Sequence, residues 1–193
     1  MTSKSEQTKA EILRAALEVL RESGAEGLTM RGVANACGRK LNNVQYYYKD
    51  KAVLLNSLAN YHFQLCENFV EDFEPSSGEL SAKAQLHEAI VYSLNYAASL
   101  SDSCLVFREL WAISTRNEAV QANLTDYYTE AFNRMVEFWY DYPLENRKKA
   151  AAILVPYVDG YSIQCQALPY SEAEMANLLT DVIYAVLTKE LAE

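Results

Sequence analysis

The chain of 193 residues is poor in the side chains that build metal centres and phosphate loops. It has two histidines, His62 and His87, and four cysteines without metal-ligand spacing, Cys37, Cys66, Cys104 and Cys165. Its six glycines form no glycine-rich phosphate loop, and no nucleophile motif or catalytic carboxylate pair is evident. We therefore expect no metal site, no cofactor and no enzymatic activity, and the cysteines suit reduced thiols packed as small apolar residues.

Long hydrophobic runs are also missing, although half of the residues are hydrophobic. The longest apolar stretch, residues 150–158, is too short to cross a bilayer and contains Pro156. The N-terminal sequence MTSKSEQTKAE is polar and does not resemble a signal peptide. These features predict a folded, globular, cytoplasmic protein.

Positive charge is scarce overall, with a net charge of −9, but it is unevenly distributed. Residues 1–56 contain nine Lys or Arg against six Asp or Glu, a net +3, and residues 57–193 contain eight against twenty, a net −12. A basic segment attached to an acidic body is typical of a nucleic-acid-binding head. The negative charge of the body discourages non-specific binding to nucleic acid. The sequence therefore divides into residues 1–56 and residues 57–193.

Apolar residues recur with helical period in almost every segment, and no segment alternates as a strand would. The pattern predicts an all-α fold of about nine helices: 8–23, 30–37, 41–48, 50–73, 81–100, 104–115, 118–142, 145–168 and 172–191. In the fourth helix we expect one buried stripe of Leu54, Leu58, Tyr61, Leu65, Phe69 and Phe73. A loop is expected at residues 74–78, and Pro143 is expected to stop the helix before it.

The spacing between residues 30 and 48 is that of a helix-turn-helix. Ala34 is small enough for two helices to cross closely, Gly38 tolerates the positive φ of the turn, and Val44 points back into the angle. Val33, Cys37 and either Tyr47 or Tyr48 complete a small core. The second helix of such a motif enters the DNA major groove.

The remaining side chains of this segment suit a DNA groove. Amides of Asn and Gln pair with adenine edges, lysines reach phosphates, and hydroxyls bind the sugar-phosphate backbone. The predicted DNA-binding residues are Thr29, Lys40, Leu41, Asn42, Asn43, Gln45, Tyr46, Tyr47 and Lys51, with Lys49 as a further phosphate contact. An ordinary helical hairpin with a solvated polar face is the alternative, because Ala, Gly and Val are common residues.

The segment resembles the DNA-binding domain of the TetR family of bacterial transcriptional regulators over roughly residues 8–57. The resemblance is carried by Leu28-Thr29-Met30, Ala34, Gly38, Tyr46-Tyr47-Tyr48 and Lys51-Ala52-Val53-Leu54-Leu55. The chain departs from the family pattern at Arg39-Lys40, where Val-Ser is usual, and at Asn42, where Gly is usual. Because the Ser normally caps the recognition helix, capping is expected to be weaker here.

The resemblance implies a homodimeric regulator, most often a repressor, which dimerises through its last two long helices, here residues 145–191. Two heads would read a palindromic operator, and a small-molecule inducer bound between the middle helices would release it. Aromatic residues suit such a pocket. The predicted ligand-binding residues are Phe107, Trp111, Tyr128 and Phe132, with His87 and Glu109 as polar candidates. The identity of the ligand stays open between a cation and a neutral aromatic or lipid-like molecule.

The alternative is a helical small-molecule carrier or enzyme that does not bind DNA. Asp126 and Glu130 lie one helical turn apart, but such a pair is usually a solvated face. A helical scaffold whose head has lost DNA binding is a third interpretation, and a test of DNA binding separates all three.

Overall fold

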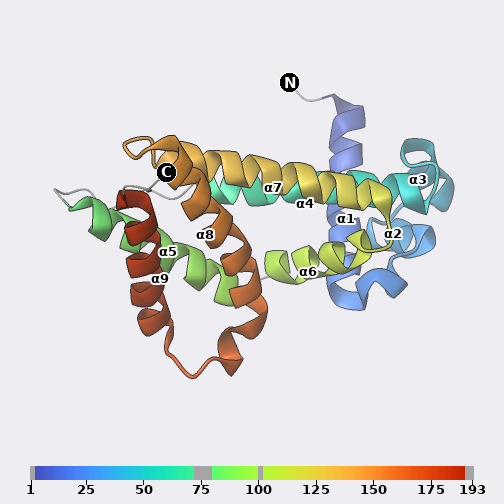
Figure 1. Cartoon of the computed structure of the whole chain (residues 1–193). Helices are drawn as coiled ribbons and strands as arrows, with labels where there is room; N and C mark the ends of the chain where they lie inside the picture. The colour runs from blue at the N-terminus through green and yellow to red at the C-terminus, as the bar shows by residue number, and fades with distance from the viewer. Residues whose placement is uncertain (1–2, 72–79, 100–101, 190–193) are drawn as a thin grey trace. The chain divides into compact units, whose positions relative to one another are not determined.

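The computed structural model describes residues 3–71, 80–99 and 102–189, and helices are the only regular secondary structure within them. Its elements are α1 (Lys4–Gly27), α2 (Met30–Ala36), α3 (Leu41–Tyr47), α4 (Lys51–Glu71), α5 (Ala82–Ala98), α6 (Asp102–Ser114), α7 (Glu118–Phe138), α8 (Leu144–Gln164), the short 3₁₀ helix η1 (Cys165–Ala167) and α9 (Glu172–Thr188) (Figure 1). This confirms the predicted all-α fold.

The helices form two compact units, which we call unit 1 and unit 2. Unit 1 contains residues 1–68 and 101–127, and unit 2 contains residues 69–100 and 128–193. Helix α6 and the first part of α7 thus belong to the same unit as the helix-turn-helix. The predicted division at residue 56 separates two continuous segments of the chain, whereas unit 1 combines two separate segments. As a domain boundary, residue 56 stays a prediction.

Unit 1 is built around α1, which contacts both α2 and α6. A capping box starts α1, because the Ser3 hydroxyl accepts from the Glu6 N–H and the Glu6 carboxylate accepts from the Ser3 N–H. The helix therefore begins four residues before the predicted start at residue 8. The fully buried apolar side chains of this unit include Ile12, Leu20, Val33, Val44, Leu54, Leu58 and Leu110.

An aromatic cluster joins α4, α6 and α7 inside unit 1. The Phe63 ring stacks on that of Tyr127 with centroids 5.2 Å apart, and the Phe107 centroid lies 5.6 Å from each of these rings. The ring of His62 lies 6.4 Å from that of Phe107. Such edge-on and offset contacts add to the burial of apolar area, so the cluster holds the three helices together.

The buried stripe of α4 differs from the predicted one. Leu54 and Leu58 are buried as expected, but further along the helix His62, Phe63 and Cys66 are buried, and Leu65 is 44% exposed. The helix has two apolar faces at similar spacing, and packing against α6 and α7 selects one of them. The predicted members Phe69 and Phe73, and the predicted loop at residues 74–78, lie outside the described side chains.

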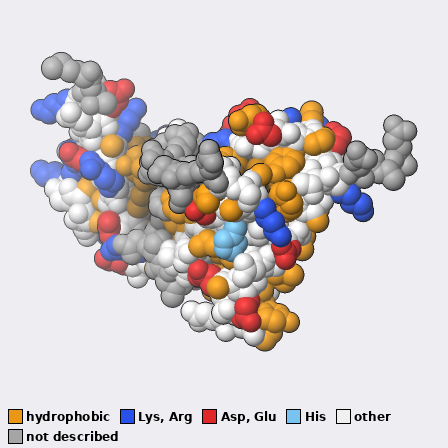
Figure 2. Space-filling model, turned by 90° about the vertical axis from the view of Figure 1, so that its left-hand side faces the viewer, with side chains coloured by type: hydrophobic (Ala, Val, Ile, Leu, Met, Phe, Trp, Pro, Cys, Tyr) orange, Lys and Arg blue, Asp and Glu red, His pale blue; other side chains and the backbone are white. Residues whose placement is uncertain are grey.

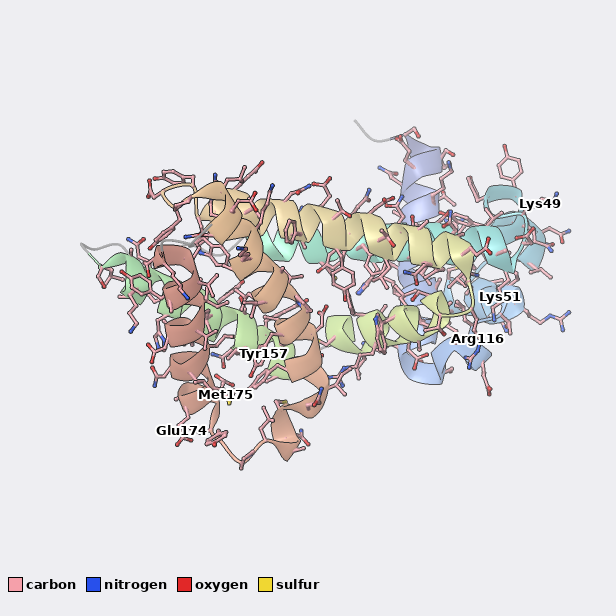
Figure 3. All side chains as sticks on the ribbon, viewed as in Figure 1. Lys49, Lys51, Arg116, Tyr157, Glu174 and Met175 are labelled. Carbon is pink, nitrogen blue, oxygen red and sulfur yellow. The ribbon has the colours of Figure 1, made fainter. Side chains whose placement is uncertain are left out.

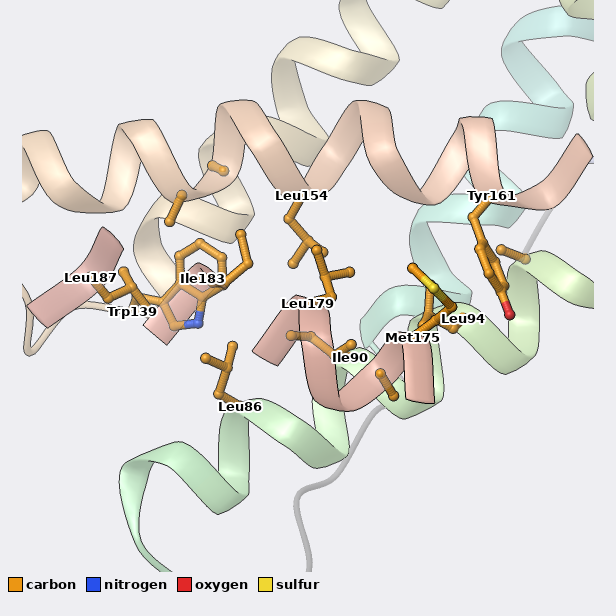
Figure 4. Close-up of a cluster of buried hydrophobic side chains, with 14 residues drawn as sticks. Leu86, Ile90, Leu94, Trp139, Leu154, Tyr161, Met175, Leu179, Ile183 and Leu187 are labelled. Atoms are coloured by element: carbon orange, nitrogen blue, oxygen red, sulfur yellow. The ribbon is translucent and has the colours of Figure 1, made fainter. Parts of the chain in front are cut away.

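A hydrophobic core of unit 2 is formed mainly by side chains of α5, α8 and α9. Figure 4 shows this core between the three helices, with Leu86, Ile90 and Leu94 from α5 facing Leu154 of α8 and Leu179 and Ile183 of α9. In Figure 1, α8 and α9 run alongside one another and are joined by a turn. The helix α7 ends at Phe138, five residues before Pro143, and Trp139 then enters the core.

A second apolar face of α8 and α9 remains uncovered in the single chain. Ile153 and Ile163 of α8 are 41% and 60% exposed, and Leu178 and Val182 of α9 are 53% and 42% exposed. Hydrophobic side chains also reach the surface in the space-filling view of Figure 2. Both helices thus carry more apolar surface than the core of unit 2 can bury.

Candidate DNA-binding surface

The turn between α2 and α3 is a Schellman motif closed by Gly38. The Gly38 N–H donates to the Asn35 carbonyl at 3.1 Å, and the Arg39 N–H donates to the Ala34 carbonyl at 2.9 Å. Gly38 has φ +63°, a conformation that L side chains rarely adopt. This confirms the role predicted for Gly38, and the 2% exposed Ala34 lies where the two helices need a small residue.

Helix α3 is anchored by two buried side chains. Val44 is fully buried and Tyr48, at the C-cap, is 4% exposed, so Tyr48 rather than Tyr47 completes the small core. The Tyr48 hydroxyl donates to the Lys9 carbonyl of α1 at 3.3 Å. Burial raises the pKa of this hydroxyl to about 12. The helix is thereby fixed against α1 along one side only.

The remaining surface of α3 presents predicted DNA-binding groups to solvent. Asn42, Asn43 and Gln45 are exposed, and Tyr46 is 82% exposed. The rings of Tyr46 and Tyr47 meet edge to face with centroids 5.0 Å apart, while Leu41 and Tyr47 are half-buried. Amides that are free of the core remain available for base edges, as direct readout requires.

The departure at Arg39-Lys40 has a structural explanation. Lys40 is the N-cap residue of α3, and its side chain makes no capping hydrogen bond, as expected from the missing Ser. Arg39 reaches back across 28 residues and pairs with Glu11 of α1 at 2.5 Å, a hydrogen bond that raises the pKa of the guanidinium. The turn is therefore tied to α1 by Arg39, for which the sequence indicated no partner.

Cationic and hydroxyl groups surround α3. Lys40 and Lys49 are exposed, and Figure 3 shows Lys49 and Lys51 at the end of unit 1 that carries α3. Lys51 is also exposed, but its Nζ donates to the Ala25 carbonyl at 3.2 Å. At the start of α2 the exposed Thr29 accepts from the Gly32 N–H at 3.0 Å and keeps its own hydroxyl proton to donate. Asp50 caps α4 as predicted, accepting from the Val53 N–H at 2.9 Å.

The four predicted ligand-binding residues fall in both units. In unit 1, Phe107 belongs to the aromatic cluster and Trp111 is 49% exposed. In unit 2, Tyr128 donates a hydrogen bond to Asp159, and Phe132 packs against the core. These residues are not brought together within either unit, so a single pocket lined by all four stays a prediction.

The two polar ligand candidates, His87 and Glu109, and the buried Asp159 each have a side-chain or backbone partner. His87 Nδ1 lies 3.1 Å from the Thr180 hydroxyl, and Glu109 accepts the Ala25 N–H at 3.0 Å, so both polar ligand candidates have structural contacts, and their role in ligand binding stays a prediction. Burial raises the pKa of Asp159, an effect partly offset by Tyr128. The Tyr157 hydroxyl is buried without a hydrogen-bond partner among the described residues.

The described residues form neither a metal site nor a membrane-spanning helix. No group of three or more His, Cys, Asp or Glu side chains could hold a metal ion there. Cys66 Sγ and His62 Nε2 lie 3.5 Å apart on one face of α4, but two such groups alone do not make a metal site. Over the same residues, none of the helices combines the length and the apolar character that a membrane span needs.

Comparison with known proteins identifies the family. The model of the tetR family of bacterial regulatory proteins matches residues 12–58. The uncharacterized HTH-type transcriptional regulator in the dhlA 5′ region of Xanthobacter autotrophicus is 39% identical over 176 residues, which cover 89% of this chain and 86% of that protein.

Two solved structures share the fold at low sequence identity. A transcriptional regulator of Rhodococcus sp. Rha1 has a TM-score of 0.74 at 17% identity, over 93% of this chain and 96% of that one. A regulator from Saccharomonospora viridis, solved in complex with choline, has a TM-score of 0.69 at 16% identity, over 93% and 96% of the two chains. The chain is therefore a DNA-binding transcriptional regulator and belongs to the tetR family of bacterial regulatory proteins.

Proposed function

We propose that this regulator binds a palindromic operator as a homodimer through α3, acts as a repressor, and is released by a small molecule. The observation that carries the proposal is the two-sided character of α3. Val44 and Tyr48 fix one side to the protein, and the amides of Asn43 and Gln45 are exposed away from that side. A helix held in this way can enter a major groove with its amides directed at base edges.

The homodimer would form through the uncovered apolar face of α8 and α9, within residues 145–191. A face of this kind is costly to expose to water and is typical of an interface between subunits. A twofold pair would place two copies of α3 about one helical turn of DNA apart, roughly 34–36 Å, or a multiple of it. One head has only a modest positive charge and would bind DNA weakly. Two heads in one dimer would add their phosphate contacts and bind more tightly.

The experiment that tests DNA binding is a bandshift with fragments around the regulator's own gene, followed by footprinting. Gln45→Ala and Asn43→Ala are expected to weaken binding at single base positions by about 1–3 kcal/mol each. Asn35→Ala is a matched control, because this amide is exposed on α2 rather than on α3. Full affinity in both α3 variants would contradict the assignment of the groove-facing side.

The dimer is tested by light scattering and by operator binding on the same samples. Leu178→Glu, in the uncovered face of α9, is expected to shift the protein to monomers and to weaken operator binding. Val53→Glu places the same charge at a site in unit 1 that is 44% exposed, and it should leave the oligomeric state unchanged. A Leu178→Glu variant that remains dimeric would exclude this face as the interface.

Release by a ligand requires that the ligand bind the DNA-free form more tightly. A tenfold loss of operator affinity needs about 1.4 kcal/mol of such preference. The choline complex of the Saccharomonospora regulator shows that a protein of this fold holds a small organic cation. Choline and a neutral aromatic compound are therefore useful first probes, with Tyr128→Phe and Phe132→Ala as variants that test the proposed pocket. Release of the operator that is unaffected by both variants would place the ligand elsewhere.

A further inference from the structure

Helix α1 contains a break at Gly24, close to the start of α2. Gly24 has φ 62° and ψ −172°, in a region of backbone space that is essentially restricted to glycine. One more turn follows, Ala25 to Gly27, before Leu28 and the N-cap Thr29 lead into α2. The break therefore forms the corner between α1 and the helix-turn-helix, and its geometry sets the direction in which α2 begins.

Both backbone polar groups of Ala25 are bound at this corner by side chains from other helices of unit 1. The Ala25 N–H donates to Glu109 Oε2 of α6 at 3.0 Å, and the Ala25 carbonyl accepts from Lys51 Nζ of α4 at 3.2 Å. A Cβ atom at Gly24 would lie 3.5 Å from Glu109 Oε2, so the carboxylate sits against the corner. The contact spans 84 residues of sequence.

The Glu109 carboxylate provides the Ala25 N–H with the acceptor that the break in α1 has removed. A backbone N–H after a helix break needs a new acceptor, as the first N–H groups of any helix do, and an ionised carboxylate is a strong one. Glu109 thus acts as a cap supplied from α6. Phe107, two residues earlier on α6, packs edge-on against both Phe63 and Tyr127, which holds this stretch of α6 in place.

We propose that Glu109 is a positioning residue for operator binding, which fixes the α1–α2 corner through the Ala25 N–H and thereby orients α3 without touching DNA. The proposal rests on operator binding by α3. It also predicts that removing the Glu109 carboxylate changes DNA affinity in the direction opposite to that expected from net charge alone. Removing a carboxylate makes the protein less negative, which by itself should favour binding to a polyanion. Loss of the corner contact should instead weaken binding.

The test compares Glu109→Ala with Glu109→Gln on the full-length protein, using a labelled duplex from upstream of its own gene. Glu109→Ala should bind about tenfold more weakly, because a hydrogen bond to a charged group contributes on this order. Glu109→Gln keeps an oxygen acceptor and should restore most of the affinity. Glu118→Ala removes an exposed carboxylate of the same unit and should bind as tightly as the unmodified protein or more tightly.

Salt dependence separates positioning from direct contact. The slope of log affinity against log salt should be unchanged in Glu109→Ala, whereas loss of one phosphate contact lowers it by about 0.9. Operator affinity in Glu109→Ala equal to that of the unmodified protein would overturn the proposal. Equal weakening in Glu109→Gln would do so as well, because the acceptor would then be irrelevant.

A readout without DNA keeps the proposal testable if the chosen duplex is not the operator. In the free protein, the Ala25 amide proton should exchange with solvent faster in Glu109→Ala than in Glu109→Gln, with circular dichroism and the melting temperature recorded for both. Failure of the unmodified protein to bind any DNA would refute the proposed function alone. Unchanged protection of the Ala25 amide in Glu109→Ala would refute the corner contact alone.

Discussion

Replacement of Gly38 tests whether the turn of the helix-turn-helix is held by backbone conformation alone. Gly38 has φ +63°, and no atom lies within 4 Å of the position that a Cβ would occupy. Gly38→Ala therefore causes no steric clash with the rest of the protein. Any loss of stability must come from placing an L residue in the left-handed region.

The expected loss can be worked from two opposing terms. The left-handed conformation costs a residue with a Cβ about 1–2 kcal/mol. Replacing Gly by Ala also restricts the unfolded chain, which returns about 0.4–1 kcal/mol. The net destabilisation by Gly38→Ala should be about 1 kcal/mol. Gly38→Asn should cost less, because Asn enters the left-handed region more readily than Ala.

Gly24 provides a matched comparison within the same unit. Its ψ of −172° lies outside the left-handed helical region, so Asn offers no relief there. Gly24→Ala and Gly24→Asn should both destabilise the protein, by about 1–3 kcal/mol. Asn should thus rescue position 38 and fail at position 24.

Urea unfolding at fixed protein concentration measures these differences as shifts of the midpoint at constant slope. Binding of the α3 variants to DNA is then compared well below the unfolding transition. A Gly38→Ala protein as stable as the parent would refute the argument from backbone strain. So would a Gly38→Asn protein less stable than Gly38→Ala.

The remaining predictions concern two tyrosines and one lysine. Tyr48→Phe removes a buried hydroxyl that donates to the Lys9 carbonyl, and it should lower the free energy of unfolding by about 1 kcal/mol. Tyr157→Phe removes a buried hydroxyl without a described partner, and it should leave the free energy of unfolding equal or higher. Urea unfolding measures both changes. The pKa of Tyr48 is raised from 10.0 to about 12 in the folded protein, so the unfolded chain loses this proton at lower pH. The contribution of Tyr48 to stability should therefore hold below pH 10 and fall between pH 10 and about 12, as measured by alkaline unfolding. Lys49→Gln should weaken binding to all DNA sequences alike and lower the slope of log affinity against log salt by about 0.9. An unchanged slope would show that Lys49 does not contact a phosphate.

Local sequence determined the helix-turn-helix and the side of α3 that faces solvent. The Schellman turn depends on a glycine at one position, and the helical period places Val44 on the side opposite Asn42 and Tyr46. The caps at Asp50 and the missing cap at Lys40 are likewise set by residues within three positions of the helix ends. Interactions of this range are contained in a short segment, so they could be predicted before any packing was known.

Tertiary structure alone decided which distant groups meet. The pairing of Arg39 with Glu11 and the contact of Glu109 with Ala25 join helices far apart in sequence, and nothing in either local pattern indicates a partner. The face that α4 buries was also decided by packing, since Cys66 and Leu65 are both apolar and adjacent, yet only Cys66 is buried. Periodicity shows that a helix has an apolar face, but where two faces are similar, the neighbours that cover one of them determine the structure.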